Sequence, residues 1–250
     1  MANDKLLDSR DVSAALGFLT RLPVKVDGEW ATARGARSSW AYPVAGLVIG
    51  AGFAAITYCA LFLGLSTGIA AALGLVAMMF VTGALHEDGL ADTVDGFWGG
   101  SNNARRLEIM KDSRIGTYGV LALASALLLH WLVVSALLDD GHIWALVAMP
   151  AASRAVMPAV MRLPHARRNG VSVAVGRPPV ETAALAALIG IAFIVPLGWD
   201  ALIIIALLAV SAAAMGALAL RKIGGQTGDI LGATQQVTQL VGWLTFLMLG

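Results

Sequence analysis

The sequence predicts an all-α, polytopic membrane helix bundle with about seven transmembrane helices. Of its 250 residues, 58% are hydrophobic and 13% are charged, whereas ordinary soluble domains carry about 25% charged residues. A soluble domain of this size cannot bury so much apolar surface, so the lipid bilayer is the expected solvent. The apolar runs lack the alternation of a membrane barrel, which favours helices.

Seven segments are candidates, because a transmembrane helix needs about 20 mostly apolar residues. They are 43–65, 67–85, 118–138, 143–161, 181–198, 201–220 and 233–249. Six or eight spans are also compatible with the pattern, since the boundaries are approximate. Many spans are rich in Gly and Ala, which serve either packing within one chain or contacts in a homo-oligomer.

We expect a single integral membrane domain over residues 1–250. Its N-terminal segment, 1–42, is predicted to be cytoplasmic or interfacial, with a short helix over 11–20. We expect the lipid bilayer as a partner, and no nucleic acid.

The positive charges alternate from one side of these spans to the other. Lys and Arg gather in residues 1–42, 86–117, 162–180 and 221–232, and none falls near 66, in 139–142 or in 199–200. Cytoplasmic loops are enriched in Lys and Arg. The long loops are therefore expected on the cytoplasmic face of the cytoplasmic (inner) membrane, as in an enzyme whose active site faces the cytoplasm.

Four acids fall within ten residues directly after an uncharged run. In "HEDGLADTVD", residues 86–95, the positions of Asp88, Asp92 and Asp95 share one face of a helix at i, i+4 and i+7, if the second span continues past Leu85. Three carboxylates on one face repel each other, which favours a bound cation, and oxygen ligands suit Mg²⁺. The alternative is a solvated helix end with scattered acids.

Two further polar runs carry candidate site residues. "EIMKDSRIGTYG" (108–119) adds Asp112 as a carboxylate, and Lys111 and Arg114 as partners for phosphate oxygens. In "RKIGGQTGDILGA" (221–233) the glycines allow backbone N–H groups to face an anion. The predicted substrate-binding residues there are Gly224, Gly225, Thr227, Gly228 and Asp229. Metal, basic groups and glycine loops together indicate phosphoryl transfer.

Five motifs resemble the cobalamin-5′-phosphate synthase (adenosylcobinamide-GDP ribazoletransferase) family. They are "FLTRLP" (18–23), "YPVAGLVIG" (42–50), "HEDGLADTVDG" (86–96), "EIMKDSRIGTYG" (108–119) and "GGQTGDILGA" (224–233). The resemblance implies that adenosylcobinamide-GDP reacts with α-ribazole or its 5′-phosphate, that GMP leaves, and that Mg²⁺ takes part.

Two other functions fit some of the same residues. "DTVDG" (92–96) matches the start of the CDP-alcohol phosphotransferase pattern, but Gly99 and Gly100 stand where that pattern needs Ala-Arg, and its later part is missing. A cation transporter could use the same carboxylates, and it would show metal flux without a nucleotide product.

Two single residues are also candidates. Arg154 lies within an apolar span, where it either extends to the cytoplasmic side or faces the bundle and contacts a carboxylate or substrate phosphate. His86 adjoins the acids and is a candidate general base. The predicted site therefore has His86, Asp95, Lys111 and Arg114 as catalytic residues, and Asp88, Asp92, Asp95 and Asp112 as metal ligands.

Overall fold

The computed structural model describes residues 5–249, and these residues form helices with no strand. The all-α prediction is confirmed. In chain order the elements are α1 (Arg10–Leu19), α2 (Gly28–Arg34), η1 (Gly35–Ala41), α3 (Tyr42–Phe62), α4 (Thr67–Thr82), α5 (Leu85–Gly99), α6 (Asn103–Ile109), α7 (Thr117–Asp139), α8 (Ile143–Ala155), α9 (Met157–Met161), α10 (Val171–Val175), α11 (Val180–Ile194), η2 (Val195–Leu197), α12 (Asp200–Ile223) and α13 (Gly228–Leu249). The remaining residues of the predicted 1–250 domain, 1–4 and 250, lie outside this description.

Several of these helices can cross a membrane, which makes the chain an integral membrane protein by length and composition. Among the described residues, 5 segments qualify alone: Gly28–Phe62, Thr117–Asp139, Ile143–Met161, Val180–Leu197 and Asp200–Ile223. The bent pair α4 and α5 raises the number to 6. The predicted number of seven is therefore not confirmed.

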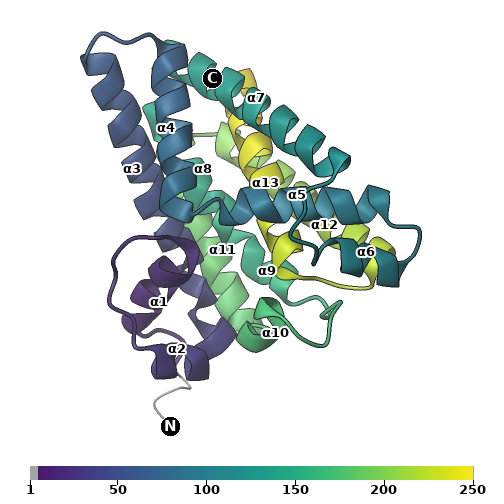
Figure 1. Cartoon of the computed structure of the whole chain (residues 1–250). Coiled ribbons are helices and arrows are strands. Elements are labelled where there is room, and N and C mark those ends of the chain that lie inside the picture. The colour runs from purple at the N-terminus through teal and green to yellow at the C-terminus, as the bar shows by residue number, and fades with distance from the viewer. Residues whose placement is uncertain (1–4, 250) are drawn as a thin grey trace.

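The last predicted span, 233–249, is an α-helix of a different character. α13 is long enough to cross a membrane, but it is not among the candidate spans given above. Its buried residues include Gln235, Gln236 and Gln239. It packs against α5, α7, α8 and α12 and runs through the middle of the bundle (Figure 1). Gln235 donates to Ser153 of α8 and Gln236 donates to Glu87 of α5, so these amides face neighbouring helices.

The second predicted span, 67–85, ends earlier than expected. α4 stops at Thr82 and α5 leaves it at 87°. Gly83 takes the left-handed conformation (φ 64°), and the N–H of Ala84 donates to the carbonyl of Met79, which is the pattern of a glycine-terminated helix. The expected continuation past Leu85 is thus replaced by a new helix. Thr67–Thr82 is the apolar part of this bent pair, and α5, which carries the acids, is its polar part.

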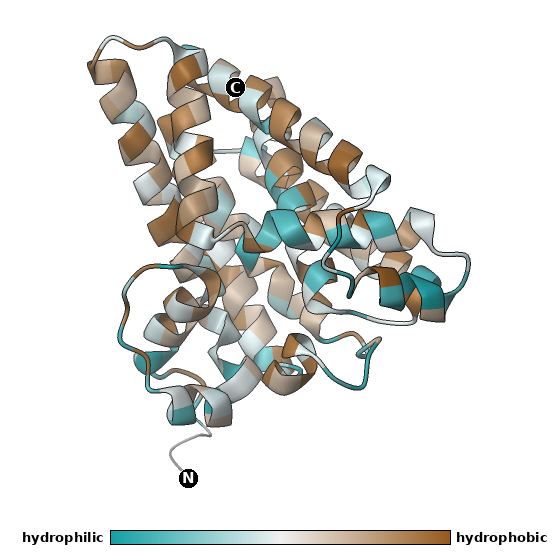
Figure 2. Cartoon of the chain, in the orientation of Figure 1, coloured by the Kyte–Doolittle hydropathy of each residue, from teal (hydrophilic) through white to brown (hydrophobic). Residues whose placement is uncertain are grey.

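The hydrophilic residues gather towards one part of the molecule (Figure 2). They concentrate on α5, α6 and the loops nearer the N-terminal end, while the far ends of α3 and α4 are mostly hydrophobic. The turn between α3 and α4 lies at the end away from α1, α2 and α10 (Figure 1). The polar helix that carries the acidic run therefore lies across the apolar helices.

The N-terminal segment is held by one buried ion pair. The predicted short helix is α1, and its Asp11 accepts two hydrogen bonds from Arg34 at 2.8 Å and one from the indole of Trp40 at 2.6 Å. Asp11 and Arg34 are 0% and 2% exposed. A two-pronged Arg–carboxylate pair fixes geometry as well as charge. It joins α1 to the end of α2, and the Trp40 hydrogen bond joins α1 to η1.

Candidate active site

The site is built where α5 crosses α13. A Cβ on Gly89 would lie 2.8 Å from the carbonyl oxygen of Asp229, and a Cβ on Gly232 would lie 3.2 Å from the Cα of His86. Small residues let helix backbones approach this closely. The two glycines therefore bring the start of the acidic run beside the start of α13, about 140 residues later in the chain.

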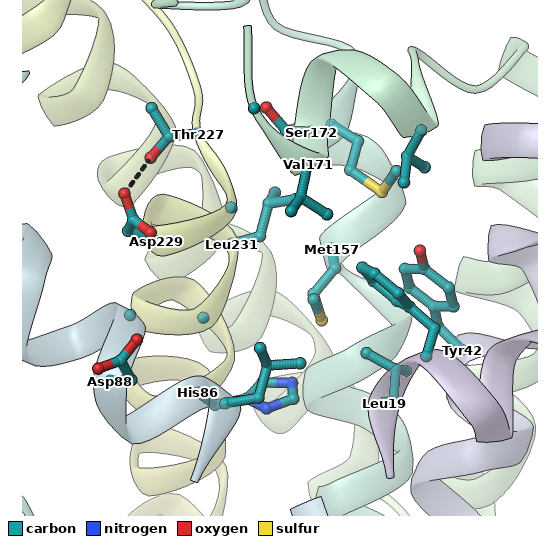
Figure 3. Close-up of a pocket in the computed structure, with 18 of the residues that line it drawn as sticks. Leu19, Tyr42, His86, Asp88, Met157, Val171, Ser172, Thr227, Asp229 and Leu231 are labelled. Carbon is teal, nitrogen blue, oxygen red and sulfur yellow. Dashed lines mark hydrogen bonds between the residues drawn. The ribbon is translucent and has the colours of Figure 1, made fainter. Parts of the chain in front are cut away.

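A cavity of about 420 Å³ opens at this crossing. Figure 3 shows its labelled lining residues arranged as two walls, with Asp88 and Asp229 on one side and Leu19, Tyr42 and Met157 on the other. The predicted site residues in its lining are His86, Asp88, Thr227, Gly228 and Asp229. The structure thus joins two of the three polar runs in one cavity.

Asp88, Asp92 and Asp229 form a carboxylate cluster. Burial, together with the negative charges of Asp88, Asp229 and Asp95, raises the pKa of Asp92 to about 7. Burial also raises the pKa of Asp229, against the opposing effect of Arg167. A carboxylate near others binds protons more readily because its charged form is repelled, and a cation would relieve the same repulsion.

Arg167 is a site residue that the sequence did not distinguish from the other positive charges of the 162–180 loop. Its Nη2 lies 3.3 Å from Asp229 Oδ2, its side chain is 15% exposed, and its Nε has no hydrogen-bond partner. It also lines the cavity. Nothing in the spacing of "LPHARRNG" (163–170) separates it from Arg168, so only the packing of this loop on α13 singles it out.

Asp95, predicted as a metal ligand and catalytic residue, contacts the start of α7. Its two carboxylate oxygens accept hydrogen bonds from the backbone N–H groups of Gly116 (2.7 Å) and Gly119 (2.8 Å). A carboxylate is favourable at the positive end of a helix. A Cβ on Gly116 would lie 2.5 Å from Asp95 Oδ1, and one on Gly119 would also collide with the carboxylate. The glycines of "IGTYG" (115–119) therefore make room for this contact.

Lys111, Asp112 and Arg114 line a second, more open cavity of about 740 Å³ with Asp95. Arg114 pairs with Asp112 at 2.7 Å, and these hydrogen bonds lower the pKa of Asp112 to about 2. Lys111 Nζ donates to Asn169 Oδ1 at 3.3 Å, and Asn169 lines the first cavity. The two cavities therefore adjoin, with Lys111 between them.

The glycine run of 224–228 divides into structural and cavity-lining residues. Gly224 ends α12 in the left-handed conformation (φ 80°), and a Cβ on Gly225 would collide with the carbonyl of Pro164. Backbone hydrogen bonds join the glycine run to the 162–180 loop: the N–H of Gln226 donates to Pro164, and the N–H of Ala166 donates to Gln226. Thr227 accepts from the N–H of Ile230 at 3.4 Å and donates to Asp229 at 3.1 Å, which caps α13. Gly224 and Gly225 thus shape the loop beside the cavity rather than line it.

Arg154 faces the bundle and does not extend to solvent. It is 1% exposed, its Nη1 donates to the carbonyl of Pro150 at 3.0 Å, and its Nε has no partner. Its charge acts on Glu87, whose carboxylate accepts from Gln236 at 3.0 Å. Burial raises the pKa of Glu87, and Arg154 opposes that shift. Arg154 does not line the cavity, so contact with a substrate phosphate stays a prediction.

His86 lies between this buried cluster and the cavity. It is 1% exposed, lines the cavity, and neither ring nitrogen has a hydrogen-bond partner. Burial, with a smaller effect of Arg154, lowers its pKa well below the ordinary value. Burial therefore favours the neutral imidazole, in which one ring nitrogen is an acceptor and the other a donor.

The predicted metal ligands are only partly brought together. Within residues 5–249, no three His, Cys, Asp or Glu side chains converge as a metal site. Asp95 and Asp112 are engaged by α7 and Arg114, as described above. The negative charge of Asp88 contributes to the raised pKa of Asp92 and of Asp229. Mg²⁺ commonly takes one or two carboxylates and completes its shell with water and substrate phosphate, and this cluster fits that requirement.

A family model described as cobalamin-5-phosphate synthase matches residues 11–247 of the chain. The chain belongs to the cobalamin-5-phosphate synthase family. The match includes both helices that cross at Gly89 and Gly232, and both walls of the cavity.

Curated relatives support this membership. A protein of Mesorhizobium japonicum named adenosylcobinamide-GDP ribazoletransferase is 47% identical over 92% of this chain and 90% of its own length. Relatives with the same name from Bradyrhizobium diazoefficiens and Azorhizobium caulinodans are each 44% identical, covering 90% and 92% of their own lengths. No solved structure matches the chain.

Two motifs of the cobalamin-5-phosphate synthase family had no chemical role in the sequence analysis. "FLTRLP" supplies Phe18 and Leu19 to the cavity, and "YPVAGLVIG" supplies Tyr42. These are ordinary apolar residues in an apolar chain, so composition does not distinguish them from core. In the sequence, only their position within motifs that resemble the family marks them as candidate site residues.

Proposed function

We propose that this protein transfers the phosphocobinamide group of adenosylcobinamide-GDP to α-ribazole or its 5′-phosphate, and releases GMP, in the nucleotide-loop assembly of cobalamin. The family match over residues 11–247 and the names of the curated relatives support the reaction. One observation locates the reaction in the structure. Residues of the 86–96 and 224–233 motifs line the same cavity, and Arg167 lies beside Asp229 there.

The proposed reaction is one phosphoryl transfer. The 3′-hydroxyl oxygen of ribazole forms a bond to the phosphorus attached to cobinamide, and the bond from that phosphorus to the oxygen of GMP breaks. The hydroxyl proton passes to a base, and GMP leaves with the electron pair. Such transfers depend mainly on positioning and on neutralising charge on the phosphoryl oxygens.

His86 is our candidate for the base. Its side chain lines the cavity, and both ring nitrogens are buried without a partner. A turn of the ring would bring one of them to the hydroxyl proton. Arg167 is our candidate for contact with a phosphate oxygen, because its Nε–H is unpartnered and guanidinium groups match phosphate geometry. Lys111 and Arg114, in the adjoining cavity, supply positive charge for the rest of the diphosphate.

Mg²⁺ is part of the proposal. Asp88, Asp92 and Asp229 would hold it together with substrate phosphate oxygens, and Asp95 and Asp112 are weaker candidates because their oxygens already accept hydrogen bonds. When bound, the ion would neutralise charge on the diphosphate as GMP leaves. Binding of Mn²⁺, followed by its electron paramagnetic resonance signal, should weaken in Asp88→Asn. It should stay unchanged in Asp27→Asn, which replaces an exposed helix cap that does not line the cavity.

We also propose that the site faces the cytoplasm from the cytoplasmic (inner) membrane. The support is the distribution of Lys and Arg, which gather in the loops that carry the site residues. Soluble nucleotide substrates would then reach the cavity directly.

The test is an assay of the purified, detergent-solubilised protein with adenosylcobinamide-GDP, α-ribazole and Mg²⁺. We expect GMP and the joined corrinoid product in equal amounts, identified by mass spectrometry. Asp88→Asn serves as the inactive control. Absence of both products in a folded preparation overturns the proposal. Release of CMP from a CDP-alcohol would instead favour the phosphotransferase, and metal flux in vesicles without nucleotide release would favour the transporter.

A further inference from the structure

The cavity at the α5–α13 crossing has two chemically unlike walls (Figure 3). One carries Asp88, Thr227 and Asp229. The other is apolar and is made by Leu19, Tyr42, Met157 and Val171, with Phe18 stacked on Tyr42. Met161 and Val175 also line the cavity. A ligand that fills this space must be polar on one side and apolar on the other.

The size of the cavity limits which substrate it can enclose. Pockets for single small molecules have volumes of about 300–1,000 Å³, and this cavity, at about 420 Å³, lies near the lower end. A nucleoside-sized molecule fits. The corrin ring of the other substrate, with its many side chains, is far larger and has to lie outside.

The apolar wall also has a flat aromatic part. The rings of Phe18 and Tyr42 are stacked with an interplanar angle of 20° and centroids 6.2 Å apart. Flat aromatic ligands gain from offset stacking on such rings in addition to the area they bury.

We propose that the apolar wall binds the flat aromatic base of ribazole, and that the ribose of ribazole points towards Asp88 and Asp229. This assignment rests on the proposed function. Ribazole is the riboside of a dimethylated benzimidazole, so its base is apolar at the edge and its polar atoms lie on the sugar side. The arrangement would present a ribose hydroxyl to the acid wall and to His86.

The other candidate occupants match the two walls less well. Guanine needs hydrogen-bond partners around its edge, and the apolar wall offers few, so burying guanine there leaves polar groups unpaired. A diphosphate could meet Asp88 and Asp229 through a bound cation, but it has no apolar surface to place against the apolar wall. A lipid acyl chain fits the apolar wall, but it would leave Asp88 and Asp229 against hydrocarbon.

The experiment narrows the cavity and compares the two substrates. Val171 is 60% exposed and lies in the short helix α10, so Val171→Trp adds bulk at the cavity without replacing a core residue. Val180 has nearly the same exposure, 59%, and does not line the cavity, so Val180→Trp is the matched control. We expect Val171→Trp to raise KM for ribazole tenfold or more and to leave KM for adenosylcobinamide-GDP within twofold. Val180→Trp should leave both KM values within twofold of wild type.

A binding measurement separates this inference from the proposed reaction. Dimethylbenzimidazole, which has no ribose, should bind wild-type protein in equilibrium dialysis, compete with ribazole but not with adenosylcobinamide-GDP, and bind at least tenfold more weakly to Val171→Trp. A rise in KM for adenosylcobinamide-GDP alone, or wild-type protein that does not bind dimethylbenzimidazole, overturns the inference. Wild-type protein that binds it and yet releases no GMP from the two substrates overturns the proposed function instead.

Discussion

Gly89 of α5 and Gly232 of α13 are in backbone contact, so that a Cβ on Gly232 would lie 3.3 Å from the Cα of Gly89. This contact sets the spacing between Asp88 and Asp229, which are each within a few residues of it. The acidic wall of the cavity depends on it, since Leu231 and Gly232 also line the cavity.

The first prediction concerns this crossing. Gly89→Ala should lower kcat at least about tenfold, because the added Cβ meets the backbone of Asp229 at 2.8 Å and must push the two helices apart. Gly52→Ala is the control, since Gly52 lies in α3 with nothing within 4 Å of the added atom. Turnover and thermal unfolding in detergent provide the measurement. Equal turnover in the two variants would mean that the close contact is not needed.

The second prediction concerns the acids. Asp88→Asn and Asp92→Asn should each lower kcat by a hundredfold or more, equivalent to about 3 kcal/mol, with a smaller effect on substrate KM. Removing a carboxylate relieves repulsion within the cluster, so folding should survive. Turnover is measured as a function of Mg²⁺ in membranes with equal amounts of protein. Wild-type rates and an unchanged Mg²⁺ requirement in both variants would favour the solvated helix end.

Asp95 should behave differently from Asp88. Its carboxylate caps α7, and loss of a helix cap costs about 0.5–2 kcal/mol. Asp95→Ala should therefore lower the unfolding temperature in detergent, whereas Asp88→Ala should leave it nearly unchanged and affect turnover alone. An Asp95→Ala protein that is as stable as wild type would remove the capping role.

Arg154 tests the buried cluster. Arg154→Met should lower activity strongly and destabilise the protein, because Glu87 and His86 lose the charge that acts on them and Glu87 stays buried. A buried carboxylate that loses a nearby positive charge becomes less favourable in its charged form. The double variant Arg154→Met/Glu87→Gln should recover part of the stability, since neither charge remains. If the double variant is as unstable as the sum of the single ones, the two side chains do not interact.

Orientation is tested by labelling in intact cells. Cys59 is exposed and is first replaced by Ser. New cysteines at Arg105 and Arg168 should then resist an impermeant thiol reagent added outside, while one at Asp140 should react. The reason is that Lys and Arg favour the cytoplasmic side, and the turn at 139–142 has neither. Labelling of Arg168→Cys from outside would reverse the proposed orientation.

Much of this protein was predictable because it depends on composition and local spacing. The apolar fraction predicted a helical membrane protein, and the spans 118–138, 143–161, 181–198 and 201–220 agree with helices of nearly the same bounds. The i, i+4, i+7 spacing of Asp88, Asp92 and Asp95 also holds, since one helix carries all three. The bend at Gly83 was not predicted, because a glycine in an apolar segment can either lie inside a helix or end it, and the sequence does not distinguish the two cases.

The sequence alone determined which residues are polar, which segments are helical and which family the motifs resemble. Only the tertiary structure decided which of those residues meet. Asp88 and Asp95 share a helix face, but seven positions along a helix span about 10 Å. Asp88 therefore lines the cavity, whereas Asp95 contacts the start of α7. Asp229 and Arg167 join the acids because glycine contacts bring α13 against α5. Local periodicity cannot contain that information, since it fixes the direction of a side chain on its own helix but not the helix that packs opposite.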